Sequence, residues 1–198
     1  RILKAYGAET VLTDPLEGSD GAIRAVRALM EQEGGSGRWF YADQYSNPMN
    51  PLAHYETTAE EIWRQTGGKV THFIAGLGTG GSFCGTARRL KELNPAVQCI
   101  SFQPDGPLHG LEGMKHMASA LVPAIYDPAL ATRDLACATE DAYDLCRRAA
   151  RREGLLVGVS AGAALAVALR VAAELEQGVV VAMLPDGADR YLSEDFWC

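Results

Sequence analysis

Short apolar runs and longer amphipathic stretches alternate along the whole chain. The apolar runs have the length of strands and lie at 10–13, 39–42, 70–75, 97–102, 155–157 and 179–184. The amphipathic stretches have helical spacing and lie at 20–32, 54–65, 82–93, 139–152 and 161–177. Strands separated by helices of this length predict right-handed βαβ crossovers. We therefore expect an α/β fold, with a mainly parallel sheet and helices on both of its faces.

Two parts of the chain fall outside this alternation. A stretch with little regular pattern runs from Gln103 to about Pro128, so we expect a long loop there. The chain opens on Arg1 in the stretch RILKAYGAE, which resembles a helix already under way. We interpret this start as a sign that processing or truncation has removed an N-terminal part.

The bulk composition narrows the function classes. Of the 198 residues, 47% are hydrophobic and 22% are charged, which is ordinary for a soluble globular protein. The net charge is −7, and the arginine pairs fall at helical spacing beside apolar residues. This pattern predicts solvated helix faces rather than a nucleic-acid site. No apolar run has the length that crosses a bilayer, and no signal peptide is recognisable, so we expect no membrane association.

The cysteines are scattered through predicted helices and strands. They form no CxxC pair, and none has a histidine at metal-ligand spacing. We therefore expect no metal site, and reduced thiols in a cytoplasmic protein. The five positions are Cys84, Cys99, Cys137, Cys146 and Cys198.

A glycine-rich turn, GLGTGGS at 76–82, follows a predicted strand and precedes a predicted helix. Glycines let bare backbone approach a ligand, and a helix N-terminus favours an anion. The hydroxyls of Thr79 and Ser82 are further donors. The turn therefore predicts a phosphate site, and the absence of a lysine after its last glycine argues against a Walker loop.

The same letters allow two other interpretations. Gly76, Gly78 and Gly81 satisfy GxGxxG, and Asp105 lies 24 residues beyond Gly81, close to where a dinucleotide site places its ribose-binding acid. A tight turn without any ligand is the third possibility, although a single turn seldom needs four glycines. The turn alone indicates a phosphate without identifying the molecule that carries it.

Four other segments, together with this turn, resemble one enzyme family in order and spacing. They are AYGAETVLTD (5–14), the segment from DQYSNP through GLGTGGS (43–82), EGLLVGVSAGAALA (153–166) and LPDGADRYLS (184–193). The chain resembles the cysteine synthase (O-acetylserine sulfhydrylase) family, fold-type II enzymes that use pyridoxal 5′-phosphate (PLP) and share the tryptophan synthase β-like fold. The loop GLEGMKHMASALVPAIYD (110–127) looks more like the B-type branch of that family than the A-type branch.

The resemblance implies roles for particular residues. Ser160 would lie beside the pyridine nitrogen of PLP, where a neutral hydroxyl leaves the ring a milder electron sink than a carboxylate would. An N-cap role for Ser160 in the helix 161–177 is compatible with this. Gln44 would help bind the α-carboxylate of the substrate, and the backbone at Gly113 would lie near the cofactor. The phosphate would be held by Gly78, Thr79, Gly80, Gly81 and Ser82.

Three further features receive weaker interpretations. Asn47-Pro48 and Asn50-Pro51 are typical of consecutive turns, a role at least as well supported as a ligand role. Lys115 and His116 would be able to contact an anionic group of the substrate. We favour solvated loop residues for both, because such charged side chains are mostly exposed.

No lysine of the chain matches the family's catalytic lysine, which forms a Schiff base with PLP. We expect that lysine, and an asparagine-containing loop that grips the substrate, upstream of Arg1. Residues 1–46 would then be the remainder of a small mobile domain, and 47–198 the large PLP-binding domain. The 198-residue chain alone is expected to be inactive, and the family implies a homodimer.

The resemblance implies synthesis of cysteine from O-acetylserine or O-phosphoserine and a sulfide donor. Three alternatives stay open. They are a cystathionine β-synthase type of replacement, a nicotinamide-dependent (NAD-dependent) oxidoreductase using the GxGxxG turn with Asp105, and a non-catalytic partner if the native chain lacks the lysine.

Overall fold

The computed structural model describes residues 2–32 and 37–197. The chain divides into two compact units, Arg1–Asp43 and Gln44–Cys198. The sheet and the cleft discussed below both belong to the second unit.

The described part of the first unit consists of helices joined by chain without strand structure. Its helices are α1 (Ile2–Ala5), the 3₁₀ turn η1 (Pro15–Glu17) and α2 (Gly18–Gln32), which confirms the helix predicted from residue 20. The strands predicted at 10–13 and 39–42 are wrong, because neither segment has strand structure. Leu12 and Phe40 are 92% and 90% exposed. Apolar, β-branched runs form strands only where a neighbouring strand pairs with them, and none does so in the described part of this unit.

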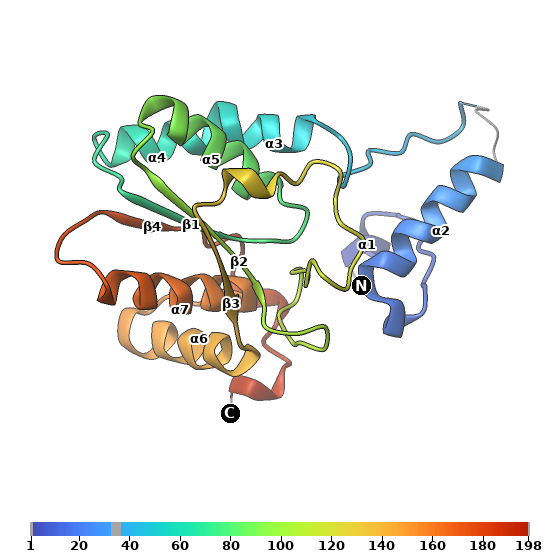
Figure 1. Cartoon of the computed structure of the whole chain (residues 1–198). Coiled ribbons are helices and arrows are strands. Elements are labelled where there is room, and N and C mark those ends of the chain that lie inside the picture. The colour runs from blue at the N-terminus through green and yellow to red at the C-terminus, as the bar shows by residue number, and fades with distance from the viewer. Residues whose placement is uncertain (1, 33–36, 198) are drawn as a thin grey trace. The chain divides into compact units, whose positions relative to one another are not determined.

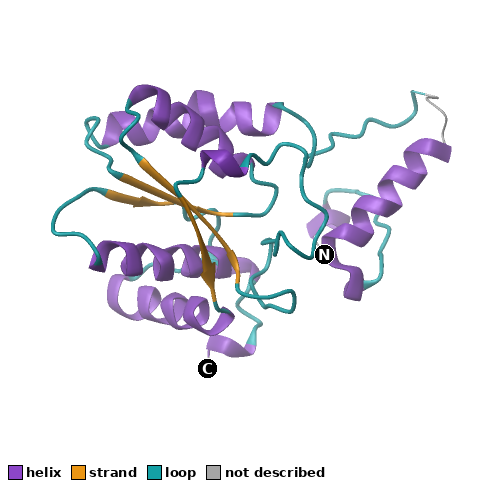
Figure 2. Ribbon diagram, in the orientation of Figure 1, coloured by secondary structure: helices purple, strands orange, loops and turns teal. Residues whose placement is uncertain are grey.

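The second unit is built around a four-stranded parallel sheet (Figures 1 and 2). The strand order is β3-β2-β1-β4, and in register His72 of β1 lies opposite Gln98 of β2 and Val180 of β4. The parallel α/β prediction is therefore confirmed. The strands are β1 (His72–Gly76), β2 (Gln98–Pro104), β3 (Arg133–Cys137) and β4 (Val180–Ala182).

Helices cover both faces of this sheet, as predicted (Figure 1). One face carries a nearly continuous helical stretch, α3 (Met49–Ala53), the π-helical turn η2 (His54–Thr58) and α4 (Ala59–Gln65), together with α5 (Gly81–Leu93). The other face carries α6 (Thr139–Glu153) and α7 (Val159–Ala173). Short 3₁₀ turns complete the unit at η3 (Pro128–Leu130), η4 (Ala188–Arg190) and η5 (Asp195–Trp197).

Two hydrophobic clusters fill the space between the sheet and its helices. Phe73 of β1 packs with Phe83 and Leu90 of α5, whereas the next residue, Ile74, packs with the α7 side. Alternate side chains of β1 thus enter opposite clusters, as the pleat of a strand requires. All four are essentially inaccessible to solvent. The central strand is therefore anchored from both faces, and its carboxyl end is held in place.

Several predicted boundaries differ from the structure. Strand β3 was not predicted, because this edge strand begins with the exposed pair Arg133 and Asp134 and lacks an apolar run. Conversely, the apolar stretch 155–157 forms only an isolated antiparallel bridge between Val157 and Gly187. The helix predicted from His54 begins five residues earlier, at Met49, so the Asn50-Pro51 pair lies within its first turn rather than in a separate turn.

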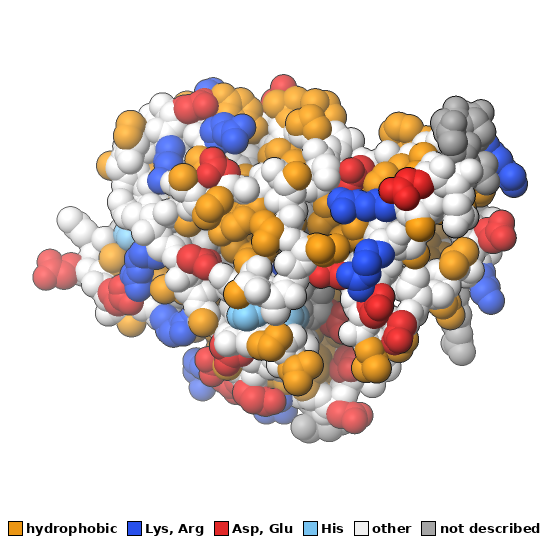
Figure 3. Space-filling model, turned by 45° about the vertical axis from the view of Figure 1, so that its right-hand side comes forward, with side chains coloured by type: hydrophobic (Ala, Val, Ile, Leu, Met, Phe, Trp, Pro, Cys, Tyr) orange, Lys and Arg blue, Asp and Glu red, His pale blue; other side chains and the backbone are white. Residues whose placement is uncertain are grey.

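Membrane-spanning helices, metal-ligating groups, surface charge and cysteines can also be examined in the described residues. Within them, no helix is long and apolar enough to cross a membrane, and no group of three or more metal-ligating side chains gathers. Charged side chains of both signs are interspersed on the face drawn in Figure 3. The four cysteines within the described range are free and buried, and burial raises the pKa of the Cys99, Cys137 and Cys146 thiols to about 11.

Candidate active site

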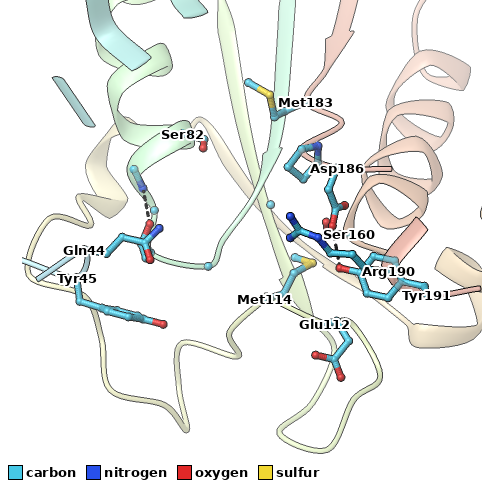
Figure 4. A pocket seen from close by; sticks show the side chains of 17 residues that line it. Gln44, Tyr45, Ser82, Glu112, Met114, Ser160, Met183, Asp186, Arg190 and Tyr191 are labelled. Carbon is cyan, nitrogen blue, oxygen red and sulfur yellow. Dashed lines mark hydrogen bonds between the residues drawn. The ribbon is translucent and has the colours of Figure 1, made fainter. Parts of the chain in front are cut away.

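A cleft of about 490 Å³ opens where strands β1 and β4 end (Figure 4). Ligands of open parallel sheets bind at this carboxyl edge, and the volume lies in the range of small-molecule sites. Its walls come from the chain after Asp43, the β1–α5 turn, the loop after β2, the start of α7 and the chain after β4. The cleft brings together all the residues to which the PLP interpretation assigned cofactor or substrate binding: Gln44, Gly78, Thr79, Gly80, Gly81, Ser82, Gly113 and Ser160.

The glycines of the β1–α5 turn are required by geometry. Gly80 has a φ of +83° at the N-cap of α5, a conformation that side chains disfavour. A Cβ on Gly78 would lie 2.6 Å from the carbonyl oxygen of Gly113, and one on Gly81 would lie 1.9 Å from Oδ1 of Asn50. Three of the cleft's lining residues therefore present bare backbone, which makes room for a ligand group at the start of a helix.

Asn50 ties this turn to the segment after Gln44. Its Nδ2 donates to the carbonyl oxygen of Gln44 (2.8 Å) and to Oγ1 of Thr79 (3.0 Å). Oγ1 of Thr79 also accepts from the backbone N–H of Gly81 at 3.3 Å. Because its oxygen accepts twice, the Thr79 hydroxyl keeps its own proton to donate. Sequence analysis gave Asn50 no such structural role.

Ser82 lines the cleft from the first turn of α5, and its Oγ lies 3.0 Å from Nε2 of His54. The other ring nitrogen of His54, Nδ1, lies 3.0 Å from Oγ1 of Thr58. Burial lowers the pKa of His54, so the imidazole is neutral near pH 7. Sequence analysis did not single out His54 or Thr58, because only the fold brings His54 against Ser82.

Ser160 is half-buried at the second position of α7, and Gly158 is the N-cap of that helix. The interpretation of Ser160 as an N-cap is therefore wrong. The helix begins two residues earlier than predicted, because the extended backbone of Gly158 (ψ 170°) ends the preceding segment. The Ser160 hydroxyl is thus left facing the cleft without a capping role.

A carboxylate that was not predicted lies beside the start of α7 (Figure 4). Oδ2 of Asp186 accepts from the Tyr191 hydroxyl at 2.8 Å, while its buried Oδ1 has no partner within the described residues. A Cβ on Gly158 would lie 2.1 Å from that Oδ1. Burial, and next the hydrogen bond to Asp186, raise the pKa of Tyr191 to about 12, so the phenol remains a donor. The only sequence signal for this pair was its place in LPDGADRYLS.

The structure corrects the interpretation of Lys115 as a solvated residue. Its side chain is only 4% exposed, and its Nζ lies 5.1 Å from the centre of the Tyr45 ring. Tyr45 lines the cleft and Lys115 does not. His116 is partly buried, and its Nδ1 lies 2.7 Å from Oγ of Ser119. The loop thus folds the lysine stem under an aromatic ring instead of extending it into solvent.

The dinucleotide interpretation finds no support in the placement of its acid. Asp105 directly follows β2, is exposed, and is not among the residues that line the cleft. A ribose bound in this cleft would therefore lack the expected carboxylate partner.

Comparisons with known proteins agree with the geometry. Residues 1–186 match the family model described as "Pyridoxal-phosphate dependent enzyme". The chain is 48% identical over 197 residues to a cysteine synthase from Aquifex aeolicus, covering 98% of this chain and 60% of that protein. It is 43% identical to cysteine synthase B from Pseudomonas aeruginosa, covering 96% and 62%.

A solved structure shows the same relation. An O-acetylserine dependent cystathionine beta-synthase from Helicobacter pylori superposes with a TM-score of 0.86 at 35% identity, covering 100% of this chain and 65% of that one. The chain spans about 60% of the length of the curated relatives named above. The family match itself extends over nearly the whole chain, so the protein belongs to the pyridoxal-phosphate dependent enzyme family.

Proposed function

We propose that this chain forms the cofactor-binding part of a cysteine synthase, which makes cysteine from an activated serine and a sulfide donor. The observation that carries the proposal is the glycine turn 76–82. Its close contacts with Asn50 and Gly113 leave bare backbone at the cleft, in the place where a phosphate would lie at the start of α5. The names of the relatives, which match 96–98% of this chain, support the same reaction class.

PLP fits the groups that the cleft presents. In this proposal the backbone of the turn and the hydroxyls of Thr79 and Ser82 hold the phosphate, while Ser160 faces the ring nitrogen. When bound, PLP withdraws electrons from the Cα of the amino acid and so assists loss of the α-proton and the β-leaving group. A serine hydroxyl leaves the ring nitrogen free to be unprotonated, which suits replacement at the β-carbon.

Two residues would position the substrate. The Gln44 side-chain amide, exposed at the mouth of the cleft, would donate to the α-carboxylate. The loop at Gly113, where φ is +78°, would bring backbone to the substrate and cofactor. The carbonyl of Gly113 packs against Gly78, so substrate loop and phosphate turn are in direct contact.

The base that removes the α-proton is not assigned to a residue of this cleft. In the second unit, Lys69, Lys91 and Lys115 all lie outside the cleft lining. We propose that the Schiff-base lysine and the asparagine-containing loop lie before Arg1 in the full protein. In the same proposal, residues 1–46 belong to a small mobile domain and 47–198 to the large domain of a cytoplasmic homodimer.

The decisive experiment uses the protein as its gene encodes it, purified and loaded with PLP. Cysteine formation is measured with O-acetylserine and with O-phosphoserine, each with sulfide, and sedimentation gives the oligomeric state. We expect cysteine from at least one of the two. Stabilisation against heat by NAD(H) but not by PLP would overturn the proposal in favour of the oxidoreductase.

A second candidate is favoured by the likeness to the Helicobacter pylori enzyme. Replacing sulfide with homocysteine in the same assay measures a cystathionine-forming activity. Turnover with homocysteine that exceeds turnover with sulfide would support this candidate over cysteine synthesis. Binding of PLP without turnover of any substrate pair would support the non-catalytic partner.

A further inference from the structure

Behind the phosphate side of the cleft lies a line of three polar side chains, Ser82, His54 and Thr58. The Ser82 Oγ to His54 Nε2 distance is 3.0 Å, and the His54 Nδ1 to Thr58 Oγ1 distance is also 3.0 Å. Ser82 lines the cleft, whereas His54 and Thr58 lie behind it on the π-helical turn η2. The three residues therefore link the cleft to the covering helix.

The approach of η2 to α5 is built into the backbone. A Cβ on Gly85 of α5 would lie 2.0 Å from the carbonyl oxygen of Pro51 and 3.0 Å from Cβ of His54. The glycine therefore allows the imidazole to lie directly against the first turn of α5. Single π-helical turns inside α-helices are frequent at functional sites.

The π-helical turn also gives Thr58 an unusual partner. A threonine within a helix commonly donates to the carbonyl four residues earlier, as Thr57 does to Ala53 at 2.6 Å. For Thr58 that carbonyl belongs to His54, and it already accepts from the N–H of Ala59. The Thr58 hydroxyl lies instead at Nδ1 of the His54 ring.

A neutral imidazole has one N–H, so the line of hydrogen bonds can run in two directions. If Nδ1 carries the proton, it donates to Thr58, and Ser82 must donate its own proton to Nε2. If Nε2 carries the proton, it donates to Ser82, and Thr58 donates to Nδ1. Only in the second arrangement is the Ser82 proton free to point into the cleft.

We propose that His54 is a positioning residue that holds the Ser82 oxygen with Nε2–H and so turns the Ser82 hydroxyl into an obligatory donor to the ligand's phosphate. Thr58 fixes this tautomer from the other side of the ring. The inference rests on the proposed function, since it concerns the phosphate of that same cofactor. A ligand without a phosphate gains nothing from this arrangement, so His54 contributes to selectivity for the phosphorylated form.

The test compares pyridoxine 5′-phosphate with pyridoxine, neither of which forms a Schiff base. Their affinities for the apo form of the gene-encoded protein are measured by calorimetry, independently of activity. We expect His54→Phe to weaken pyridoxine 5′-phosphate about three- to tenfold, the size of one lost hydrogen bond to an anion-binding donor, and pyridoxine less than about twofold. His54→Gln, whose amide can still donate, is expected to recover part of the loss.

A double-mutant cycle shows whether His54 acts through Ser82. We expect His54→Phe to cause no further loss in a Ser82→Ala background. Thr58→Val should lower the affinity for the phosphorylated ligand about two- to threefold, because the His54 ring loses the hydrogen bond that holds it in place from the other side. The matched control is Thr57→Val on the same turn, which should leave both affinities unchanged.

Nitrogen NMR of His54 gives a readout that a merely structural role would not move. We expect the Nε2–H tautomer when pyridoxine 5′-phosphate is bound. The Nδ1–H tautomer in the wild-type complex would overturn the inference. An equal loss of affinity for both ligands in His54→Phe would overturn it as well. So would a loss of the same size when His54→Phe is introduced into the Ser82→Ala background.

Failure of the proposed function looks different from failure of the inference. If the wild-type protein binds pyridoxine 5′-phosphate no better than pyridoxine, the phosphate site itself is wrong. If the wild type prefers the phosphorylated ligand and His54→Phe and Thr58→Val keep that preference in full, only the role of His54 is wrong. Circular dichroism of each variant shows whether it is folded, and Thr58→Val tests the idea if His54→Phe is not.

Discussion

Two sides of the cleft achieve their shape by different means. On the glycine side, within residues 76–82, the backbone at Gly78 and Gly81 lies so close to Gly113 and Asn50 that no side chain fits there. On the carboxylate side, Ser160, Asp186 and Tyr191, the surface is made by side chains, one of which holds another through a 2.8 Å hydrogen bond. One side is fixed by excluded volume and the other by polar pairing.

This difference predicts different responses to substitution. On the glycine side, an added methyl group fits only if the close-packed backbone itself moves. Polar pairing can be removed atom by atom, and the free-energy change then depends on which buried group is left without a partner. Substitutions on the two sides should therefore differ in both size and character.

The largest effect is expected for Gly78→Ala on the glycine side. The new Cβ would lie 2.6 Å from the carbonyl oxygen of Gly113, so the substrate loop or the turn must shift. We expect at least about tenfold weaker binding of pyridoxine 5′-phosphate and a loss of stability of about 1–3 kcal/mol. Calorimetry and urea unfolding measure the two quantities.

Gly106→Ala is the matched control for this substitution, because among the described residues no atom beyond its own chain neighbours would lie within 4 Å of the new Cβ. It should change neither quantity. Wild-type affinity in Gly78→Ala would mean that the Gly113 loop yields easily, and the proposed contrast between rigid and adjustable sides would be lost.

On the carboxylate side, Tyr191→Phe should reduce stability by about 1–3 kcal/mol without changing the preference for a phosphorylated ligand. The substitution leaves the half-buried Asp186 carboxylate without the phenol that donates to its Oδ2, while its buried Oδ1 has no partner among the described residues. Urea unfolding measures the loss. Tyr6→Phe, at a side chain that is 85% exposed, serves as the control. An unchanged free energy of unfolding would show that another donor reaches Asp186.

The hydrogen bond between Tyr191 and Asp186 should also have a smaller effect, on the stability of the protein at high pH. The pKa of Tyr191 is about 12 in the folded protein, against 10.0 for an ordinary tyrosine. The folded state therefore holds this proton more tightly, so the stabilisation is complete below pH 10 and is lost as the pH rises from 10 to 12. The buried cysteines also lose stabilisation above pH 9, since their pKa values are raised to about 11.

The difference in melting temperature between wild type and Tyr191→Phe isolates the tyrosine, because both proteins carry the same cysteines. This difference should shrink as the pH rises from 10 to 12. A difference in melting temperature that stays constant over this range would contradict the assignment of the raised Tyr191 pKa to its pairing with Asp186.

How much of each side could be predicted from sequence follows from the same contrast. Where close approach of two backbones requires glycine, the glycines themselves appear in the sequence. The turn at 76–82 could therefore be predicted. The pairing of Asp186 with Tyr191 was not, because an aspartate in sequence gives no indication that one of its oxygens will be buried without a donor. His54 was missed for a similar reason, since it meets Ser82 only through the fold.

The fold shows where local pattern is sufficient and where it is not. The central strands and their helices were predicted because both faces are buried and their apolar runs are continuous. Edge strand β3 was missed because its exposed Arg133 and Asp134 interrupt any such run. Lys115 was predicted to be solvated from the usual behaviour of lysines, and a long-range contact with Tyr45 overrides that tendency.

The smallest effect on stability is expected for Ser160→Ala, and it tests the carboxylate side most directly. An N-cap serine would cost about 1 kcal/mol when replaced by alanine. Here Gly158 is the N-cap of α7, so we expect the free energy of unfolding to change by less than about 0.5 kcal/mol. Ser193→Ala, at an exposed serine, provides the reference for a neutral change. If Ser160→Ala leaves stability unchanged but alters the absorbance of bound PLP, the hydroxyl serves the ligand alone. A loss near 1 kcal/mol would instead show that it supports the helix, and the carboxylate side would then depend on side chains for its structure as well as for its chemistry.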